Sequence, residues 1–569
     1  MQAHIKQIKK ELDEYNNELL SDFVGTRERF IMYAIYTFAG LMDNLQRNRD
    51  LKDFLNHLNN GLHAMDVLLE WSRAIEERSD DFSDIPPIMP KGVLNYMLDL
   101  YDKAEDYSIV TEAFSSRFTS VDIKDKVVTM TSKSETDYLR EQASHALRAK
   151  RAKADYERDG AVWDKIAKDG TAEQWSQLER IGRNPEYLLP THLENLESNQ
   201  LHPTGKRYKM LYAYYTERNK RTCEFDLSCD LGGFTVSDYI AVLSALESVA
   251  AENYIKCFAL YNDPVLSLYM RFNIGEALTG SVTDPAERID LLSYWCVTAD
   301  KDEFISRIAK LSSRSIDVAK RAIAFMTYDL TRDGGHIVES PVIELCGKLI
   351  IPPFIVPNYN LMSLLPNKLS TYSPELYIDL MKDVSSKKIA ELTEMLREVG
   401  GFHVWTEITL MGGNKPITDI DILVHDPRDN AVLLIEHKAN CSPYTEKLHY
   451  VDKSLRKAES QLEKAKQYIT EHRDSFLTER GISADASIDV CILMANNLGS
   501  SSSGVTTPII NTDEMYKLIE SSRGSLKRLY AGLENENYMR KIDTSTYYVG
   551  KSAYEYAGYT FIFDALKFR

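Results

Sequence analysis

Two short segments near the C-terminus constrain the fold of this chain most. Thr418–Val424 alternates acidic and apolar residues, and Val432–Lys438 is an apolar run that ends in Glu-His-Lys. The connection between them is rich in Asp, Asn and Pro, which favour tight turns, so the pattern predicts a β-hairpin. The pairing brings Asp421 and Glu436 near one end of a sheet, with Lys438 on the same face as Glu436. Two carboxylates and an ammonium group are what a divalent cation and a phosphodiester require.

The overall composition is that of a large, acidic globular chain. A length of 569 residues suggests several domains. Lys plus Arg number 68 and Asp plus Glu 85, so the formal net charge is −17. This charge opposes binding of nucleic acid by the whole surface, and such a substrate would have to meet a local basic track.

The compartment is predicted from cysteine usage and from the absence of a targeting signal. The seven cysteines are scattered, without zinc-ligand spacing, which fits a reducing cytosol. The N-terminal stretch is charged and amphipathic, and the most apolar early stretch, Ile31–Met42, is too short to span a bilayer. We therefore expect a cytoplasmic protein that does not associate with membranes.

The pattern along the chain predicts three regions. Residues 1–340 are mostly helical in pattern, and we expect them to sense a signal or to bind a partner or substrate. Residues 341–384 carry short strand-like runs and a proline-rich connection. Residues 385–569 are expected to form an α/β domain with a C-terminal extension. The predicted fold class is thus multidomain, with a mostly α-helical N-terminal region followed by an α/β domain built on a mixed sheet.

Individual elements are predicted most clearly in the third region. The expected order is a helix at 385–399, strands at 402–411, 417–425 and 431–438, a helix at 447–473 and a strand at 487–495. In the first region, residues 122–131 are interpreted either as a short strand pair or as an exposed edge.

That order of elements, with those residues, resembles the PD-(D/E)XK nuclease superfamily over residues 385–500. Asp421 stands at the position of the metal-binding aspartate, and Glu436, His437 and Lys438 stand for the (D/E)xK triplet. The first of the two segments begins with Thr-Asp in place of the nominal Pro-Asp. The resemblance implies a restriction-endonuclease-like α/β fold and hydrolysis of phosphodiester bonds.

The resemblance also implies the chemistry of the site. Asp421, Glu436 and the main-chain carbonyl of His437 would bind Mg²⁺, a hard cation that prefers oxygen ligands, and Mn²⁺ would substitute for it. The metal ion would lower the pKa of a bound water and neutralise charge on the phosphate. Lys438 would orient or help to activate that water and pair with the scissile phosphate.

Several further residues are candidates for supporting roles. Members of the superfamily often carry a glutamine on the helix after the triplet, and Gln461 occupies that position here. Exonuclease-like branches add a tyrosine four residues later, where this chain has an alanine, so the branch is left open. Possible helpers are a glutamate on the helix before the first strand, a glutamate on that strand and an aspartate beside the metal-binding one: Glu391 or Glu394, Glu407 and Asp419.

The predicted helix at 447–473 is basic within an acidic protein. Its cations could follow a phosphate backbone, and the weak candidates for nucleic-acid binding are Lys453, Arg456, Lys457 and Lys464. The equally supported alternative is a solvated helix face with ion pairs four residues apart.

Two functions follow from these observations. The first is a Mg²⁺-dependent nuclease acting on DNA, and a large sensor-like region joined to a terminal nuclease resembles bacterial antiviral defence effectors. The alternative is a binding or scaffold protein whose nuclease-like domain is catalytically silent and acts in a complex. In either case the helical region could hold a protein partner or a second copy of the chain.

Overall fold

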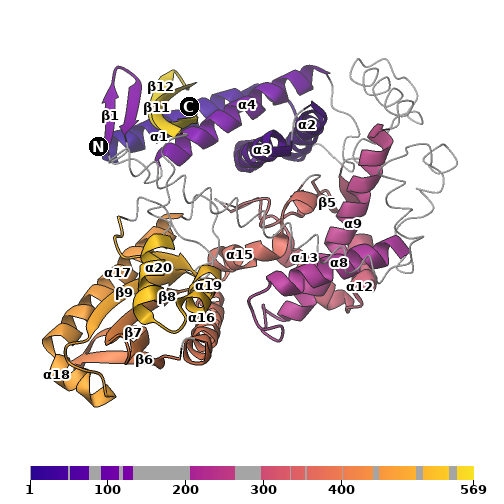
Figure 1. Cartoon of the computed structure of the whole chain (residues 1–569). Coiled ribbons are helices and arrows are strands. Elements are labelled where there is room, and N and C mark those ends of the chain that lie inside the picture. The colour runs from indigo at the N-terminus through magenta and orange to yellow at the C-terminus, as the bar shows by residue number, and fades with distance from the viewer. Residues whose placement is uncertain are drawn as a thin grey trace. The chain divides into compact units, whose positions relative to one another are not determined.

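The chain divides into two compact units, and Figure 1 shows the whole chain coloured by residue number. The first comprises Met1–Thr111, Asp155–Lys368 and Tyr554–Thr560, and the second comprises Glu112–Ala154, Leu369–Ala553 and Phe561–Arg569. The computed structural model describes residues 2–48, 51–75, 91–114, 120–131, 206–262, 296–332, 335–352, 355–399, 401–439, 448–494, 504–536 and 547–568. Within these ranges no helix is both long enough and apolar enough to cross a membrane.

The described part of the first unit is mostly helical, as the pattern over residues 1–340 predicts. Its helices are α1 (Gln2–Ser21), α2 (Arg27–Asn48), α3 (Leu51–Trp71), α4 (Lys91–Phe114), α8 (Lys206–Thr222), α9 (Val236–Asn262), α12 (Lys301–Ser312), α13 (Ile316–Met326) and α14 (Ile355–Asn358), with short 3-10 helices η1 (Ser72–Ala74) and η4 (Leu361–Leu364). An antiparallel sheet is formed by β3 (Val297–Asp300), β5 (Lys348–Ile351) and β4 (Ile343–Leu345). Helix α15 (Leu365–Tyr372) leads along the chain to the second unit.

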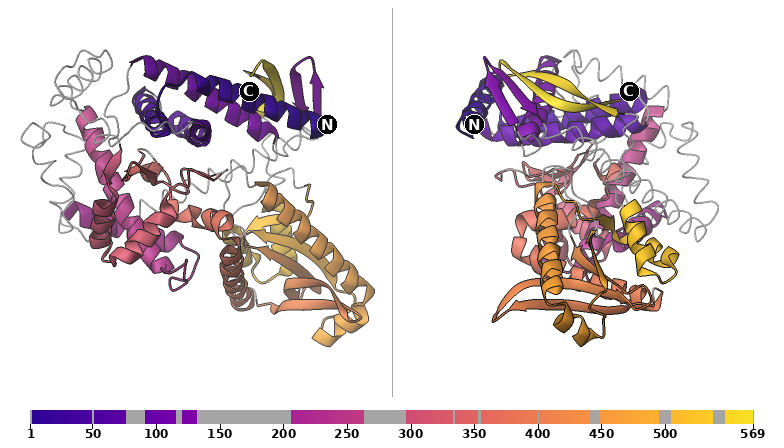
Figure 2. Two further views of the ribbon diagram at one scale, coloured as in Figure 1. Left: turned by 180° about the vertical axis from the view of Figure 1, so that it is seen from behind. Right: turned by 60° about the vertical axis from the view of Figure 1, so that its left-hand side comes forward.

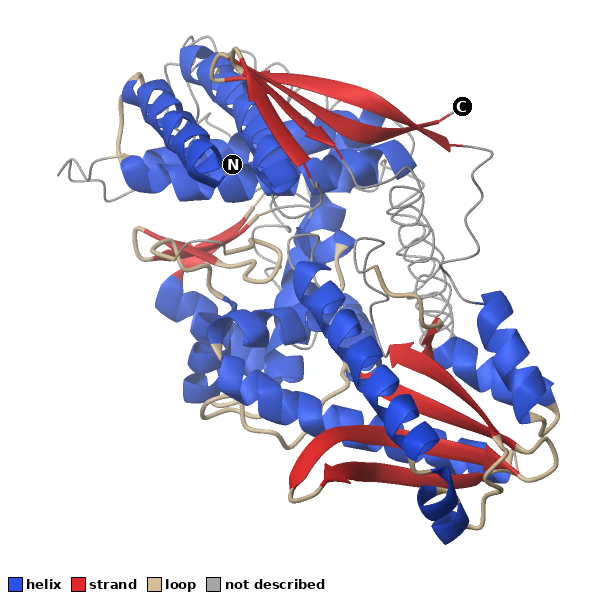
Figure 3. Cartoon of the chain, turned by 90° about the vertical axis from the view of Figure 1, so that its left-hand side faces the viewer, coloured by secondary structure: helices blue, strands red, loops and turns tan. Residues whose placement is uncertain are grey.

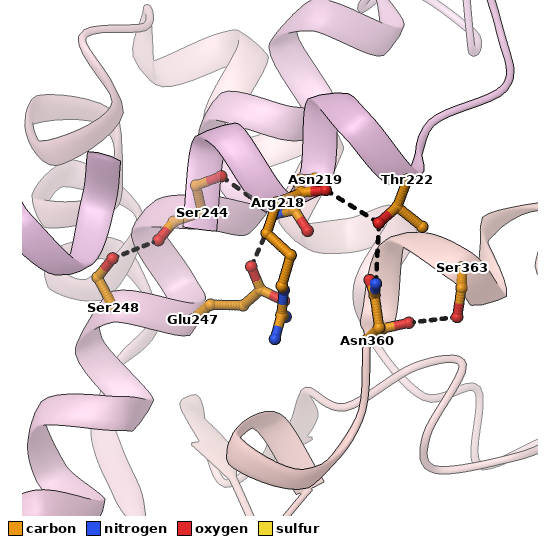
Figure 4. Close-up of polar contacts among 8 residues, drawn as sticks. All are labelled: Arg218, Asn219, Thr222, Ser244, Glu247, Ser248, Asn360 and Ser363. Carbon is orange, nitrogen blue, oxygen red and sulfur yellow. Dashed lines mark hydrogen bonds and ion pairs between the residues drawn. The ribbon is translucent and has the colours of Figure 1, made fainter. Parts of the chain in front are cut away.

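A buried polar network joins α8 to α9 in the first unit (Figure 4). The Arg218 guanidinium lies 2.8 Å from Oε1 of Glu247, and Nδ2 of Asn219 donates to Oε2 of the same carboxylate at 2.7 Å. Glu247 is completely buried. Because both of its oxygens accept hydrogen bonds, the desolvation of this carboxylate is compensated within the protein. The network extends to the segment before η4, where Asn360 donates to Thr222 at 2.9 Å.

The second unit contains a five-stranded mixed sheet between helices. Its elements are α16 (Pro374–Glu398), β6 (His403–Gly412), β7 (Lys415–Asp426), β8 (Ala431–Lys438), α17 (Leu448–Glu471), α18 (Arg473–Phe476), η6 (Thr478–Arg480), β9 (Ser487–Met494), β10 (Ile509–Asn511), α19 (Thr512–Ser522) and α20 (Leu526–Glu536). The strand order is β10-β9-β8-β7-β6. β6, β7 and β8 pair antiparallel, whereas β8, β9 and β10 pair parallel. This is the mixed sheet that the sequence predicts.

Two hydrophobic cores cover the two faces of this sheet (Figures 1 and 2). On one face, Val432 and Leu434 of β8 pack against α17, and on the other, Leu433 and Ile435 pack against α16, α19 and α20. Side chains of a strand alternate between the faces. Continued to the end of β8, this alternation directs Glu436 and Lys438 toward α17, and the residue between them toward α16.

The C-terminal strands form a separate sheet with an early hairpin. β1 (Ser120–Lys124) and β2 (Val127–Thr131) pair antiparallel, as one of the two interpretations of residues 122–131 predicts. The sheet order is β1-β2-β12-β11, with β11 at Tyr547–Tyr556 and β12 at Tyr559–Phe568. The turn between these last strands belongs to the first unit, where Tyr559 donates to Glu11 of α1 at 2.5 Å. The predicted region 385–569 is therefore divided between the two units.

Candidate metal-binding site

The candidate site lies where the ladder between β7 and β8 ends. The paired residues run from Asp426 and Ala431 to Ile422 and Ile435. The next position in this register would set Asp421 opposite Glu436. There the carboxylate of Asp421 accepts the main-chain N–H of His437 at 2.7 Å. The side chain of Asp421 is therefore the hydrogen-bond partner of this N–H. The carboxylates of Asp421 and Glu436 both lie at the end of the ladder.

Glu436 is the most unusual residue of the site, because it is ionisable, only 1% exposed and, among the described residues, paired through one of its two oxygens. Its Oε1 accepts a hydrogen bond from the ammonium group of Lys438, whereas its buried Oε2 has no hydrogen-bond partner within the described structure. Burial raises the pKa of Glu436 to about 7, against the opposing effect of Lys438. A buried, unpaired carboxylate oxygen is costly, and a bound cation is one of the few partners that would offset that cost.

Two further carboxylates, those of Asp419 and Glu407, lie near Asp421. Burial is the largest cause that raises the pKa of Asp421, and the charges of Asp419 and Glu407 raise it further, so both lie within electrostatic range. The N–H of His437 and the charge of Lys438 act in the opposite direction. The structure therefore brings both predicted helpers of β6 and β7 toward Asp421.

Glu407 occupies its position through an irregularity in β6. The paired residues on either side of it are Thr406 with Ile422 and Ile408 with Ile420, which leaves Glu407 opposite Asp421. Its φ of 53° lies in the left-handed region, which a residue with a side chain seldom adopts. Such conformations cost about 1–3 kcal/mol and concentrate at functional sites.

The predicted glutamine reaches the same group of side chains from α17. The Oε1 of Gln461 lies 3.3 Å from Nζ of Lys438, which also contacts Glu436. Ala465, four residues later, is completely buried in the core between α17 and the sheet. A tyrosine would overfill that position, so the departure from the exonuclease pattern has a reason in the core. Tyr468 lies two turns after Gln461 and stacks on a histidine ring instead.

Three of the four basic candidates on α17 share the side of Gln461. Lys457 lies four residues before Gln461, Lys453 eight before and Lys464 three after, and all three are exposed. These spacings return to the same side of an α-helix. Arg456 lies five residues before Gln461 and projects from another side of α17. Lys457 also lowers the pKa of the buried glutamate on β8, so its charge reaches the site.

The two glutamates of the preceding helix lie elsewhere. Glu391 and Glu394 are exposed on α16, which covers the face of the sheet opposite α17. Glu391 lies 3.9 Å from Lys388 of the same helix. The structure does not bring these two predicted helpers to the other carboxylates, because the helix pattern gave their position along α16 but not the face of the sheet that α16 covers.

The His437 side chain points away from the candidate site. Its Nδ1 lies 3.0 Å from the hydroxyl of Ser385 on α16. Burial lowers the pKa of His437 to about 4, so the ring is neutral near pH 7. Only the main chain of this residue can therefore serve the site, as the resemblance implies. The contact with Ser385 was not anticipated, although strand alternation already set this ring on the other face.

The donor set fits a hard divalent cation. Among the residues that the structure describes, no group of three or more His, Cys, Asp or Glu side chains forms a ready metal cage. The carboxylates of Asp421 and Glu436 and the main-chain carbonyl of His437 would offer a cation three oxygen donors and leave its other positions to water. Mg²⁺ is commonly bound in this way, through one or two carboxylates and its own waters.

No family model, curated protein or solved structure matches this chain.

Proposed function

We propose that residues 385–500 form a PD-(D/E)XK, restriction-endonuclease-like domain and that the chain is a Mg²⁺-dependent nuclease acting on DNA. The mixed sheet supports this proposal, with three antiparallel strands followed by parallel β9 and with α16 and α17 on opposite faces. The observation that carries it is the buried Oε2 of Glu436, which has no hydrogen-bond partner among the described residues and lies close enough to Asp421 to feel its charge. A carboxylate that the protein itself leaves unsatisfied is suited to a cation from solution.

Each side chain has a distinct role in this mechanism. Asp421 and Glu436 would hold the cation, with the carbonyl of His437 as a third ligand. When bound, Mg²⁺ supplies a water of lowered pKa and neutralises charge that builds up on the phosphate. Lys438 would move its ammonium group from Glu436 toward the scissile phosphate, and Gln461 would hold that group in place. Lys453, Lys457 and Lys464 would follow the backbone of the substrate.

The cleavage experiment compares two lysine variants of the full chain. Supercoiled plasmid is incubated with Mg²⁺ and with wild type, Lys438→Ala or Lys387→Ala, whose lysine is exposed on α16. We expect nicking or linearisation by wild type and Lys387→Ala, and a loss of roughly 10³-fold or more for Lys438→Ala, equivalent to about 4 kcal/mol of transition-state stabilisation. Equal cleavage by all three proteins would reject Lys438 as part of the machinery.

Calorimetry tests the metal site without turnover. Titration of Mn²⁺ into wild type should give a binding heat that Asp421→Ala loses and Lys387→Ala keeps. If wild type binds no Mn²⁺ and cleaves no plasmid or RNA, the alternative applies, namely a binding or scaffold protein with a silent nuclease-like domain. RNA cleavage without plasmid cleavage would mean that the substrate is RNA, whereas the proposed hydrolysis of phosphodiester bonds would stand.

A further inference from the structure

The hairpin of β6 and β7 projects beyond the rest of its sheet (Figure 3). β8 pairs with β7 only over Ile422–Asp426, so the part of β7 from Lys415 to Ile420 pairs with β6 alone. Five successive pairs separate the candidate site from the turn, which corresponds to roughly 17 Å at about 3.3 Å per residue. The candidate site therefore lies at the base of a two-stranded arm.

The tip of this arm exposes apolar side chains that the fold does not use. Every residue from Met411 to Ile417 is exposed, with Met411 43% and Ile417 41% accessible. The register shifts between Leu410 and Met411, so Ile417 is the extra residue of a bulge. Bulges re-aim a side chain, and the side chain of Ile417 lies across Gly412 of the facing strand. The turn itself is tight, with Gly413 at a φ of 67°.

The arm also differs in charge from the rest of the protein. From Ile408 to Thr418 the only charged residue is Lys415, in a chain of net charge −17. The acidic residues Glu407 and Asp419 lie at the base, beside the metal-binding carboxylates. Beyond Asp419, which belongs to the second pair from the base, the arm carries no negative charge that would repel a polyanion.

These features favour a nucleic-acid duplex over a single strand as the partner of the arm. The major groove of a nucleic-acid duplex is about 12 Å wide and admits a two-stranded β-ribbon, whereas single strands are bound by aromatic stacking. No aromatic residue occurs between Ile408 and Thr418. The tip instead carries Asn414 and Lys415, which can contact base edges, and apolar groups of the kind that contact a thymine methyl group.

We propose that the β6–β7 arm enters the major groove of duplex DNA next to the candidate site and reads bases there. This inference rests on the proposed function, because it takes the scissile phosphate to lie at Asp421 and Glu436. An arm of roughly 17 Å reaches about five base pairs from that phosphate, at about 3.4 Å per base pair. The substrate of the nuclease is then duplex DNA, and the preference for a cleavage site is set at a distance from the cut.

Binding is measured in a background that cannot turn over. In the full chain carrying Glu436→Gln, fluorescence anisotropy is recorded with a labelled 30-base-pair duplex and with one of its strands. The arm variant combines Met411→Ser, Lys415→Ala and Ile417→Ser. The matched control is Ile378→Ser, whose side chain is 52% exposed on α16. We expect the arm variant to raise the Kd for the duplex at least tenfold, with the single-strand Kd within twofold and the control unchanged.

A footprint tests the groove itself. Dimethyl sulfate modifies guanine N7, which lies in the major groove, and the arm should protect guanines about five base pairs from the cut in the control but not in the arm variant. Circular dichroism and the thermal midpoint establish that the arm variant is folded.

Three results would overturn the inference. The duplex Kd of the arm variant could equal that of the control, the loss could be the same for duplex and single strand, or wild type could be a dimer that the arm variant converts to a monomer. The last result would assign the arm to a second copy of the chain. Failure of the proposed function can be distinguished from failure of this inference. If duplex binding depends on the arm but the wild type cleaves no plasmid, the nuclease activity is rejected and the role of the arm in DNA binding stands.

Discussion

Two buried glutamates, one in each unit, differ in how their charge is compensated. Glu247 is 0% exposed and Glu436 1% exposed, and burial is the largest cause that raises the pKa of each. Both oxygens of Glu247 accept hydrogen bonds, from Arg218 and Asn219. Glu436 contacts Lys438 through one oxygen, and its other oxygen has no hydrogen-bond partner in the described structure. The two carboxylates are therefore equally buried, but among the described residues only that of Glu247 has hydrogen-bond partners for both oxygens.

The difference distinguishes a glutamate with a structural role from one for which we propose a function. Glu247 joins two long helices at a position where neither is interrupted, and both oxygens of its carboxylate are paired within the protein. Glu436 lies where the β7–β8 ladder stops, and β6, the strand on the other side of β7, carries the left-handed residue Glu407. A buried carboxylate whose two oxygens are both paired needs no further partner, whereas one with an unpaired oxygen requires a further explanation. Here that explanation is the proposed cation, and each of the following experiments tests it.

The largest expected contrast is in catalysis. Glu436→Gln should lower the cleavage rate by roughly 10³–10⁵-fold, about 4–7 kcal/mol of transition-state stabilisation, because an amide is a poor ligand for Mg²⁺. Glu247→Gln should stay within about tenfold of wild type per folded molecule. The measurement is single-turnover plasmid cleavage at saturating Mg²⁺, with the folded fraction determined separately. A similar loss in both variants would remove the distinction between the two glutamates.

For stability, in contrast to catalysis, we expect the larger loss on substitution of Glu247. Glu247→Ala leaves the Arg218 guanidinium buried without its carboxylate, which should cost about 3–5 kcal/mol. Glu436→Gln in metal-free buffer should cost less than about 1 kcal/mol or stabilise the protein, because it removes a poorly satisfied charge. Because a two-unit chain does not unfold in one step, hydrogen exchange of peptides from α9 and from β7–β8 reports each effect locally. Loss of protection in β7–β8 of Glu436→Gln would contradict this prediction.

Glu436 should also make the stability of metal-free β7–β8 depend on pH. Its folded pKa of about 7 lies above the ordinary 4.5, so the folded state holds the proton more tightly. Its contribution is therefore greatest at low pH and is lost as pH rises from about 4.5 to about 7, by up to about 3 kcal/mol. His437 acts with the opposite sign, since its lowered pKa of about 4 removes stability as pH falls below its ordinary 6.5.

A comparison of variants separates the effect of Glu436 on stability from the opposing effect of His437. In the presence of EDTA, the ratio of hydrogen-exchange protection between wild type and Glu436→Gln cancels both His437 and the intrinsic pH dependence of exchange. For peptides of β7–β8 this ratio should fall about tenfold or more between pH 5 and pH 7.5. A ratio that does not change with pH would mean that Glu436 has an ordinary pKa and a solvated environment.

The elements of the second unit were predictable because local periodicity specifies them. The strands expected at 417–425 and 431–438 are β7 at Lys415–Asp426 and β8 at Ala431–Lys438, and the helix expected at 447–473 is α17 at Leu448–Glu471. Alternation along β8 also gives the common face of Glu436 and Lys438. The helix expected from residue 385 begins earlier, at Pro374, because proline is favoured in the first turn of a helix.

Features that depend on contacts between distant residues could not be predicted in this way. The left-handed conformation of Glu407 and the bulge at Ile417 arise from pairing between strands, not from residue preferences. The pairing of Arg218 with Glu247 joins helices whose separate patterns show only buried faces. The contact of Tyr559 with α1 spans nearly the whole chain, and no local signal specifies it. Oε2 of Glu436, which has no hydrogen-bond partner in the described part of the chain, likewise owes its surroundings to contacts between distant residues.

The smallest expected effect concerns Gln461, whose amide oxygen lies 3.3 Å from Nζ of Lys438. Gln461→Ala removes one weak hydrogen bond that positions the ammonium group, worth about 1 kcal/mol, so kcat should fall roughly 5–10-fold. Because Gln461 is not a proposed metal ligand, the Mg²⁺ concentration for half-maximal rate should stay the same. Gln467→Ala is the control, since Gln467 is exposed on α17 and donates to Glu471 of the same helix at 2.9 Å. A loss as large as that of Glu436→Gln would instead give Gln461 a direct contact with the reacting phosphate.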